Sequence, residues 1–472
     1  KKQFGKGGKQ MLWNAKMRFG KTLSALQVVK EMDFKRTLIL THRPVVNAGW
    51  FEDFGKIFYD SPSYAYGSRH NGEPHHLLEQ RSSQADLHYV YFASMQDLRG
   101  SELVGGHFDK NDAIFSTPWD FIIIDEAHEG TQTELGRAVI AELAKSSTKM
   151  LRLSGTPFNL LDNCKEEEIY TWDYVMEQRA KAEWDKIHMG DPNPYAGLPC
   201  MNIYTYDLGN LLHEYRDEEM AFNFTEFFRV GSDGTFKHAD HVRSFLHLLS
   251  QEDEESCYPY ANDTYRSIFR HTLWMLPGVA AARALKEMRE NHPVFSYFHV
   301  VNVAGDGARE EESRDALTAV QKAIGHDPDK TRTITLSCGR LTTGVSVKAW
   351  TAVFMLSGGY TTGASSYMQT IFRVQTPATI NGRTKEQCYV FDFAPDRTLR
   401  VLAETAKLSA KAGKTSENDR KAMGDFLNFC PVISIEGSQM KPYDVPRMLE
   451  KLKRAYRERV VNNGFEDNSL KN

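Results

Sequence analysis

The stretch "QMLWNAKMRFGKTLSALQVVKEM", residues 10–32, combines three patterns that together predict one local fold. The short apolar run "QMLW" predicts a strand, and "LSALQVVKEM" has the spacing of an amphipathic helix. The loop between them ends in Gly-Lys-Thr. A strand, loop and helix in this order turn successive backbone N–H groups and the positive helix end toward one spot, which suits a phosphate. We therefore expect a phosphate-binding loop, with Lys21 on the β- and γ-phosphates and the Thr22 hydroxyl on Mg²⁺.

The loop departs from the usual pattern in two places. Ala15 replaces the first glycine, and Arg18 occupies a position that is often glycine in related loops. By itself, the motif leaves a fortuitous Gly-Lys-Thr at a helix start as an open alternative, because short motifs produce false positives. The residues expected to contact a nucleotide here are Ala15, Arg18, Phe19, Gly20, Lys21 and Thr22.

A second stretch, "FIIIDEAHEG" at residues 121–130, supports the same chemistry. The run "FIII" lacks alternation, as expected of a central strand that is buried on both faces. It delivers Asp125 and Glu126 to its carboxyl end, where ligands bind in open α/β sheets. Phosphoryl transfer to water needs one carboxylate for the Mg²⁺ ion and another for the attacking water. Helix-capping acids would explain each residue separately, but they would not explain the loop upstream.

The composition describes an ordinary globular protein. With 472 residues, 41% hydrophobic and 25% charged, the chain is long enough for two to four domains. It has no run of the roughly 18 apolar residues that a membrane-spanning helix needs, so we expect a cytoplasmic protein. The six scattered cysteines form no CxxC pair, which predicts free thiols without disulfides or structural zinc. Because the formal net charge is −4, nucleic-acid binding would have to come from local patches.

Patterning along the chain predicts an α/β fold with two parallel sheets. Residues 10–160 alternate β-rich runs with amphipathic segments, and residues 268–396 repeat this texture. The intervening 161–264, rich in aromatic and acidic residues, reads as an insertion or accessory segment. After 397 the sequence becomes helical and polar, and it ends in a basic amphipathic helix. The opening at Lys1, without methionine, suggests a piece of a longer protein.

These motifs resemble those of superfamily 2 helicases and translocases, and they occur in the same order. "AKMRFGKT" resembles motif I and "DEAH" resembles motif II. The further matches are "LILTHRPVV" (38–46) to motif Ia, "FASMQDL" (92–98) to the next nucleic-acid-contacting motif, "LSGTPF" (153–158) to motif III, "LWMLPGVAAA" (273–282) to motif IV, "GRLTTGVSV" (339–347) to motif V and "QTIFRVQ" (369–375) to motif VI. The resemblance covers about residues 10–396, and the ordered set is far more specific than any one motif.

The resemblance implies two RecA-like domains in tandem, with ATP and Mg²⁺ in the cleft between them. Lys21 and Thr22 would bind phosphate and Mg²⁺, Asp125 would hold Mg²⁺ and Glu126 would hold the water. Ser154 and Thr156 would couple hydrolysis to domain movement, and Gly344 would contact the nucleotide. Gln369 and Arg373 would reach the nucleotide from the second domain, with Arg373 as the arginine finger. The expected parts are a first domain (1–160), an inserted accessory segment (161–264), a second domain (265–412) and a helical C-terminal extension (413–472).

A nucleic-acid strand would cross the top of both domains in such a protein. Short polar side chains and backbone N–H groups at strand ends suit contacts with phosphates, which position a strand without reading its sequence. Taken alone, each candidate would be read as an ordinary capping or loop residue. Only the resemblance makes it a candidate for contact with nucleic acid. The candidates are Thr41, His42, Arg43, Ser94, Gln96, Thr342 and Thr343.

Two features narrow or question the resemblance. Motif VI usually carries a second arginine three residues after the first, but this chain has Thr376 there, so either Arg373 acts alone or another arginine such as Arg340 helps. "MRFGKT", "RLTTGVSV" and the C-terminal tail resemble the helicase portion of bacterial or phage restriction proteins of the type III group. That implies double-stranded DNA as substrate, with a nuclease or methyltransferase elsewhere. An RNA helicase or remodeller, and a nucleotide-gated scaffold without motor activity, stay open as alternatives.

Overall fold

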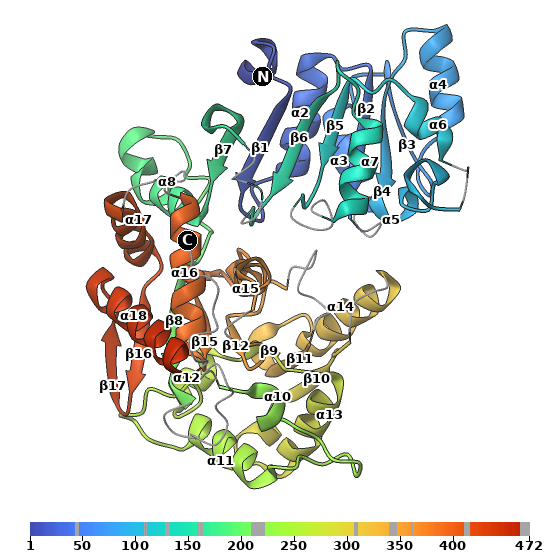
Figure 1. The fold of residues 1–472 in the computed structure, drawn as a ribbon. Helices are drawn as coiled ribbons and strands as arrows, with labels where there is room; N and C mark the ends of the chain where they lie inside the picture. Colours follow the sequence, from blue (N-terminus) through green and yellow to red (C-terminus); the bar gives the residue numbers. More distant parts are fainter. Residues whose placement is uncertain are drawn as a thin grey trace. The chain divides into compact units, whose positions relative to one another are not determined.

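The computed structural model separates into two compact units, Lys1–Tyr174 and Val175–Asn472. It describes residues 1–42, 47–107, 109, 111–127, 133–157, 160, 164–208, 222–305, 310–338, 347–359, 362–409 and 416–462. Each unit is built around its own mainly parallel sheet (Figure 1). The α/β class predicted from the sequence is therefore confirmed.

The first unit contains a seven-stranded sheet in the order β3-β4-β2-β5-β6-β1-β7, in which all neighbouring strands are parallel. Its strands are β1 (Gln10–Ala15), β2 (Arg36–Thr41), β3 (Tyr64–Ser68), β4 (His88–Ser94), β5 (Phe121–Ile124), β6 (Lys149–Ser154) and β7 (Ile169–Trp172). Its helices are α1 (Lys2–Gly5), α2 (Lys21–Met32), α3 (Asn47–Ile57), α4 (His75–Gln84), α5 (Met95–Leu98), α6 (Asp112–Ser116) and α7 (Glu134–Leu143).

Helices cover both faces of this sheet, which is why its central strands are apolar throughout. Leu38 and Leu40 of β2 pack into one core together with residues of α4 to α7. Ile39, between them, packs into the other core with residues of α1, α2 and α3. Successive side chains of a strand point to opposite faces, so a doubly covered strand needs apolar residues at every position.

The second unit contains an eight-stranded sheet in the order β10-β11-β9-β12-β15-β8-β16-β17. Every pair is parallel except the hairpin of β16 and β17. Its strands are β8 (Cys200–Tyr206), β9 (His271–Met275), β10 (His299–Asn302), β11 (Thr333–Ser337), β12 (Ala352–Met355), β15 (Gln387–Asp392), β16 (Val432–Glu436) and β17 (Gln439–Pro442), and β13 (Thr379–Ile380) pairs separately with β14 (Arg383–Thr384). The helices are α8 (Tyr174–Ile187), which begins at the boundary, α10 (Phe224–Phe227), α11 (Ala239–Ser250), α12 (Asp263–Ile268), α13 (Val279–Met288), α14 (Glu310–Ile324), α15 (Ala364–Ile371), α16 (Pro395–Ser409), α17 (Ser416–Phe429) and α18 (Val445–Asn462).

The range 161–264, expected as an accessory segment, is divided between the two units. Strand β7 adds to the edge of the first sheet beside β1, whereas β8 lies inside the second sheet between β15 and β16. Aromatic residues of this range, among them Phe227 and Phe245, belong to the same core as Phe354 and Phe391 of the second sheet. The aromatic texture noted in the sequence therefore reflects a contribution to the core of the second unit.

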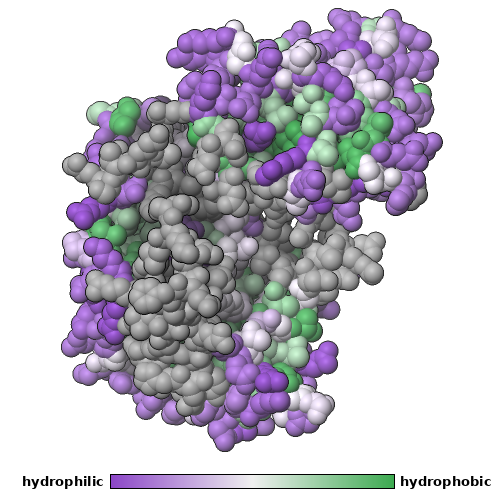
Figure 2. Space-filling view, in the orientation of Figure 1, coloured by the Kyte–Doolittle hydropathy of each residue, from purple (hydrophilic) through white to green (hydrophobic). Residues whose placement is uncertain are grey.

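The range 413–472 contains two helices, α17 and α18, as expected, but also the hairpin of β16 and β17. Since β16 pairs with β8, this range extends the second sheet. Most of the coloured surface in Figure 2 is hydrophilic, in keeping with the packing of apolar residues into the cores. Across the described residues, none of the helices has the length and apolar character needed to cross a membrane.

Candidate nucleotide-binding site

The parallel strands of the first sheet bring the predicted site residues to a single edge. In their order across the sheet, β4, β2, β5, β6 and β1 end at Ser94, Thr41, Ile124, Ser154 and Ala15. Asp125 and Glu126 follow β5 directly, and the Gly-Lys-Thr loop follows β1. The strands therefore place the loop, the two carboxylates and the polar strand ends in one row along the carboxyl edge, where ligands bind in open α/β sheets.

The backbone of the loop explains why glycine is common at two of its positions. Arg18 has φ +67° and Gly20 has φ +82°, so both adopt the left-handed conformation. Left-handed residues within such a loop turn neighbouring N–H groups to one side, which forms a concavity for anions. Glycine reaches this conformation without cost, whereas Arg18 does so at about 1–2 kcal/mol.

Phe19, the bulky residue of the loop, anchors it to the edge strand β7. Its ring lies 6.2 Å from the rings of Tyr170 and Trp172 on β7, and 6.5 Å from that of Trp13 on β1. The Lys16 N–H also donates to the Trp172 carbonyl, at 2.9 Å. Aromatic pairs at these centroid distances are attractive, so the loop is held from the β7 side.

Lys21 lies over the inner side of the loop. Its Nζ donates to the Ala15 carbonyl at 3.1 Å. A Cβ added at Gly155, after β6, would come within 3.5 Å of Lys21 Nζ and 3.4 Å of the Ala15 oxygen. Gly155 therefore lets the end of β6 pass close to the loop, and the ammonium lies where a bound phosphate would replace the carbonyl as its partner.

Thr22 lies on the first turn of α2, and its hydroxyl donates to Asp53 Oδ2 on α3 at 2.5 Å. The other oxygen, Oδ1, accepts from Lys56 at 3.1 Å. Because the hydroxyl hydrogen is used in the bond with Asp53, the lone pairs on Thr22 Oγ1 stay available for a cation.

Asp125 is buried with only part of its hydrogen-bonding capacity used. The Trp50 indole N–H of α3 donates to Oδ2 at 3.1 Å, and the Glu126 N–H donates to Oδ1 at 3.0 Å. Burial and the neighbouring Glu126 carboxylate raise the pKa of Asp125 to about 6, while the charge of Lys21 and the bond from Trp50 act in the opposite direction. A carboxylate in such an environment favours the approach of a cation.

Glu126 adopts a left-handed backbone, with φ +47°. Its neighbours fix this turn, since Asp125 N–H donates to the Leu40 carbonyl at 2.8 Å and Ala127 N–H donates to the Leu153 carbonyl at 2.9 Å. A non-glycine residue held in this conformation stores strain, which is common at functional sites.

The residues present fit Mg²⁺ bound with a nucleotide. Mg²⁺ prefers oxygen ligands and is typically held by one or two protein groups together with substrate phosphates. Thr22 supplies a hydroxyl whose hydrogen already has an acceptor, and Asp125 supplies a buried carboxylate that electrostatically favours a cation. The lysine and the anion-binding loop belong to the same edge.

The residues expected to couple hydrolysis to movement lie at the end of β6. Ser154 is fully buried, and its hydroxyl accepts from the Thr156 N–H at 3.1 Å. Thr156 is also buried. This short turn holds Gly155 against the phosphate loop, so the motif is in direct proximity to the nucleotide residues.

The strand ends expected to contact nucleic acid differ in accessibility. Thr41 and Ser94 are register partners on β2 and β4, and both are buried. The Ser94 hydroxyl caps α5 by accepting from the Asp97 N–H at 3.1 Å. His42 is half-buried and Gln96 is exposed. Three further candidates, Arg43, Thr342 and Thr343, lie outside the described residues, as do Arg340 and Gly344, the latter expected at the nucleotide.

In the second unit, α15 and the following 3₁₀ turn carry the motif VI residues. Gln369 on α15 is half-buried, and Arg373 in the turn Phe372–Gln375 is buried. Thr376 stands where a second arginine is usual, and its hydroxyl donates to the Arg373 carbonyl at 2.9 Å. The threonine thus closes the turn that carries Arg373.

Three residues at this edge were not found by sequence reasoning. Trp50 and Asp53 of α3 contact the two residues expected to hold Mg²⁺. Arg69 follows β3 and forms an ion pair of 3.1 Å with Asp97 of α5, which adds a cation beside the strand ends. The local sequence around Trp50 and Asp53 has no motif, and β3 had not been identified as a strand.

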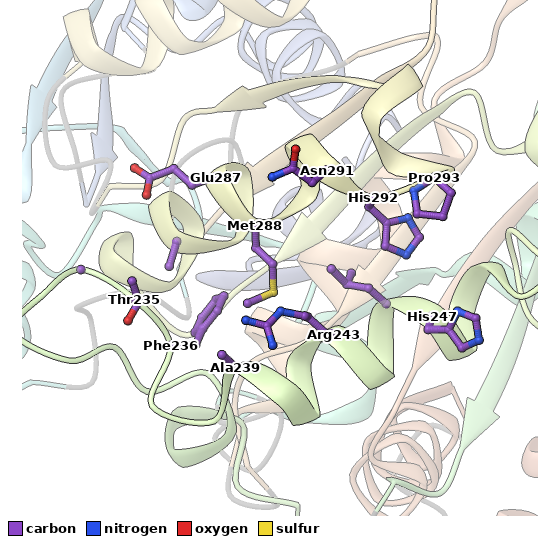
Figure 3. A pocket seen from close by; sticks show the side chains of 13 residues that line it. Thr235, Phe236, Ala239, Arg243, His247, Glu287, Met288, Asn291, His292 and Pro293 are labelled. Carbon is purple, nitrogen blue, oxygen red and sulfur yellow. The ribbon is translucent and has the colours of Figure 1, made fainter.

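A separate cavity of about 550 Å³ lies in the second unit between α11 and α13 (Figure 3). Phe236, Arg243 and Met288 point into the same space in this view. The lining from α13 comes from its C-terminal half, Ala284 to Met288. Because a helix following a parallel strand runs back along it, this end lies toward the amino ends of the strands, away from the edge where α/β ligands bind.

Comparison with known proteins agrees with this architecture. Residues 2–159 match the family described as type III restriction enzyme, res subunit. A Mycoplasma pneumoniae protein named as the C-terminus of the type II restriction enzyme and methyltransferase RM.MpnORF110P is 26% identical over 521 residues, which span 94% of this chain and 68% of that protein.

The structure of the ATP-dependent type ISP restriction-modification enzyme LlaBIII bound to DNA matches with a TM-score of 0.53 and 14% identity. The match covers 97% of this chain but only 32% of LlaBIII. This likeness shows the fold, two RecA-like domains in tandem, as the sequence predicted. Residues 2–159 are thus similar to the res-subunit family of type III restriction enzymes, and the chain as a whole resembles the helicase portion of restriction-modification proteins.

Proposed function

We propose that this chain is an ATP-dependent DNA helicase or duplex-DNA translocase, the motor of a restriction or phage-defence type system. The observation that carries the proposal is the row of groups at one edge of the first sheet. There, Lys21, Thr22 and the buried Asp125 lie beside strand ends that continue toward the polar residues of β2 and β4.

Each residue has a chemical role in this proposal. Lys21 and the N–H groups of the loop bind the phosphates of ATP, and Thr22 with Asp125 holds Mg²⁺, which neutralises charge on the phosphate oxygens when bound. Glu126 orients the water that attacks the γ-phosphate. Gln369 and Arg373 contribute from the second unit, with Arg373 stabilising charge on the transferred phosphoryl group.

Nucleic acid is proposed to contact the same edge further along the sheet. His42 and the exposed Gln96, together with Arg43, follow the strand ends of β2 and β4. Thr41, Ser94, Thr342 and Thr343 complete the proposed contacts. Polar groups of this kind bind phosphates and carry no sequence information, which suits a motor that moves along any sequence.

DNA is the proposed substrate because the similar LlaBIII structure is that of an enzyme bound to DNA, and the Mycoplasma relative is named a restriction enzyme and methyltransferase. That the DNA is double-stranded is proposed from the resemblance of the motifs to type III restriction helicases. The proposal therefore includes a nuclease or methyltransferase, on another part of the same protein or on a partner.

The rate of ATP hydrolysis with duplex DNA, single-stranded DNA and RNA tests this function. Duplex DNA is expected to stimulate hydrolysis most. Stronger stimulation by RNA would replace the proposal with an RNA helicase or remodeller. ATP binding without stimulation by any of the three would replace it with a nucleotide-gated scaffold.

A further inference from the structure

Helix α3 contacts both residues that are proposed to hold Mg²⁺. Trp50 donates from its indole N–H to Asp125 Oδ2 at 3.1 Å, and Asp53 accepts from the Thr22 hydroxyl at 2.5 Å. Residues three apart on a helix lie on the same face. One face of α3 therefore hydrogen-bonds to both proposed Mg²⁺ ligands, Thr22 on α2 and Asp125 after β5. Trp50 is fully buried, and the Asp53 side chain is 17% exposed.

The two contacts orient the ligands from behind. Asp53 accepts a hydrogen bond from the Thr22 hydroxyl. This bond orients the lone pairs of Thr22 Oγ1 away from α3. Trp50 and the Glu126 N–H hold the two oxygens of Asp125 in a fixed plane. Groups that hydrogen-bond metal ligands in this way typically change metal affinity or activity by about 10- to 100-fold when removed.

The N-terminus of α3 is fixed at the carboxyl end of β3, beside β4, whose own end is proposed to contact nucleic acid. Asn47, the first residue of α3, donates to the Ser68 hydroxyl at the end of β3 at 3.0 Å and accepts from the Tyr66 hydroxyl at 2.8 Å. Strand β3 lies next to β4, and β4 lies next to β2. One helix of eleven residues therefore joins the end of β3, the neighbour of β4, to both proposed Mg²⁺ ligands.

We propose that α3 couples nucleic-acid contact to Mg²⁺ binding, with Trp50 and Asp53 as positioning residues for Asp125 and Thr22. This inference rests on the proposed function, because it needs ATP with Mg²⁺ at one end of the edge and nucleic acid at the other. A displacement of α3 by nucleic acid moves both ligands together, since both hydrogen bonds belong to one helix face.

Asp53→Ala and Trp50→Phe test the inference, each with a matched control. Glu52→Ala also removes an acid of α3 that binds Lys56, at 2.8 Å, but Glu52 makes no contact with Thr22. Trp119→Phe removes another buried indole of the same unit, one that donates to the Ile114 carbonyl at 2.9 Å. Thermal unfolding of all four variants verifies that they fold.

Calorimetric titration with ADP, in the presence and absence of Mg²⁺, provides a readout that does not depend on activity. Asp53→Ala and Trp50→Phe are expected to weaken the Mg²⁺-dependent part of the affinity about 10- to 100-fold and to leave Mg²⁺-free binding of ADP unchanged. The two controls are expected to match the unsubstituted protein. If one of the two α3 variants does not fold, the other carries the test.

Coupling is measured as the ratio of ATP hydrolysis with and without duplex DNA, at saturating Mg²⁺. Both α3 variants are expected to lower this ratio, whereas the controls keep it. Unchanged Mg²⁺ dependence and an unchanged ratio in the folded α3 variants would overturn the inference and leave the proposed function intact. Absence of any Mg²⁺ effect or DNA stimulation in the unsubstituted protein would instead overturn the proposed function.

Discussion

Two buried aspartates at the carboxyl ends of strands, one in each sheet, show how a carboxylate in an ion pair differs from the carboxylate proposed to bind a cation. Asp125 follows β5 in the first sheet, and Asp392 ends β15 in the second. Asp392 pairs with Arg397 at 2.6 Å and also accepts from the Tyr367 and Thr398 hydroxyls at 2.8 and 2.6 Å. Asp125 accepts from an indole and a backbone N–H and, among the described residues, has no direct ion pair.

The difference shows what distinguishes a ligand from a packing residue. The partners of Asp392 belong to α15 and α16, so this network links the end of β15 with both helices. At the carboxyl edge of the first sheet, Asp125 has a raised pKa and is followed by Glu126, whose backbone is left-handed. The loop after β1 at the same edge contains Arg18, which is also left-handed. Strain and incomplete pairing around Asp125, against the charge pairing of Asp392, support the first edge as the proposed site of the chemistry.

Breaking the satisfied network is expected to have the largest effect on stability. Asp392→Asn leaves the Arg397 guanidinium buried without its counter-charge, which is expected to cost about 3–5 kcal/mol of unfolding free energy. Denaturant unfolding measures this loss. Asp329→Asn, which removes the half-buried partner of the exposed Arg383 in the same unit, serves as control and is expected to change little. Equal effects of both substitutions would contradict the contrast between the two aspartates.

Neutralising Asp125 is expected to increase the unfolding free energy, whereas neutralising Asp392 lowers it. Its folded pKa of about 6 lies above its ordinary value of 3.8, so the charged form costs stability above pH 6 and nothing once both states are protonated. Asp125→Asn is therefore expected to stabilise the nucleotide-free protein by up to about 3 kcal/mol at pH 8. The gain should disappear as the pH falls toward 4. Unfolding curves at both pH values measure it, and a pH-independent difference would refute the raised pKa.

Removing the anchor of the strained loop is expected to have a smaller effect. Phe19→Ala deletes three aromatic contacts of a half-buried ring and is expected to cost about 2 kcal/mol. Binding of ADP should also weaken, because the loop loses its fixed position. Thermal unfolding and calorimetry report the two effects. Phe51→Ala, at an exposed ring of α3, is the control, and ADP affinity equal to the control would show that Phe19 does not hold the loop.

Relieving the strain at position 18 is expected to change stability least. Arg18→Gly removes the cost of a left-handed side chain, about 1–2 kcal/mol, and adds the greater unfolded-state freedom of glycine, about 0.5–1 kcal/mol. The net change in unfolding free energy is expected to lie within about 1 kcal/mol, with ADP binding retained. A loss of ADP binding would assign the Arg18 side chain a direct role at the nucleotide.

The sequence predicted the central strands because their signals are local. The run "FIII" and the Gly-Lys-Thr loop place Asp125 and Lys21 at strand ends, and parallel pairing then brings them to one edge. Strand β8 had no such signal, because its neighbours β15 and β16 lie far along the chain. The β16–β17 hairpin was missed although its turn includes Gly437 at φ +65°, a recognisable signal.

The contacts of α3 mark the limit of sequence reasoning at the site. Lys21, Thr22, Asp125 and Glu126 belong to motifs and were named from them. Trp50 and Asp53 act only through partners 75 and 31 residues away, and no local pattern indicates such partners. The nucleic-acid candidates also differ in burial, which the sequence did not indicate. Ser94 is buried and caps a helix, whereas Gln96 is exposed.

The most direct test of the account is the rate of phosphate release from ATP, with and without duplex DNA, for the unsubstituted protein and for Lys21→Ala. The account predicts DNA-stimulated release by the unsubstituted protein and its loss in Lys21→Ala, because Lys21 is the cation proposed to bind the phosphates of ATP. Stimulated release that persists in a folded Lys21→Ala protein would contradict the proposed nucleotide site.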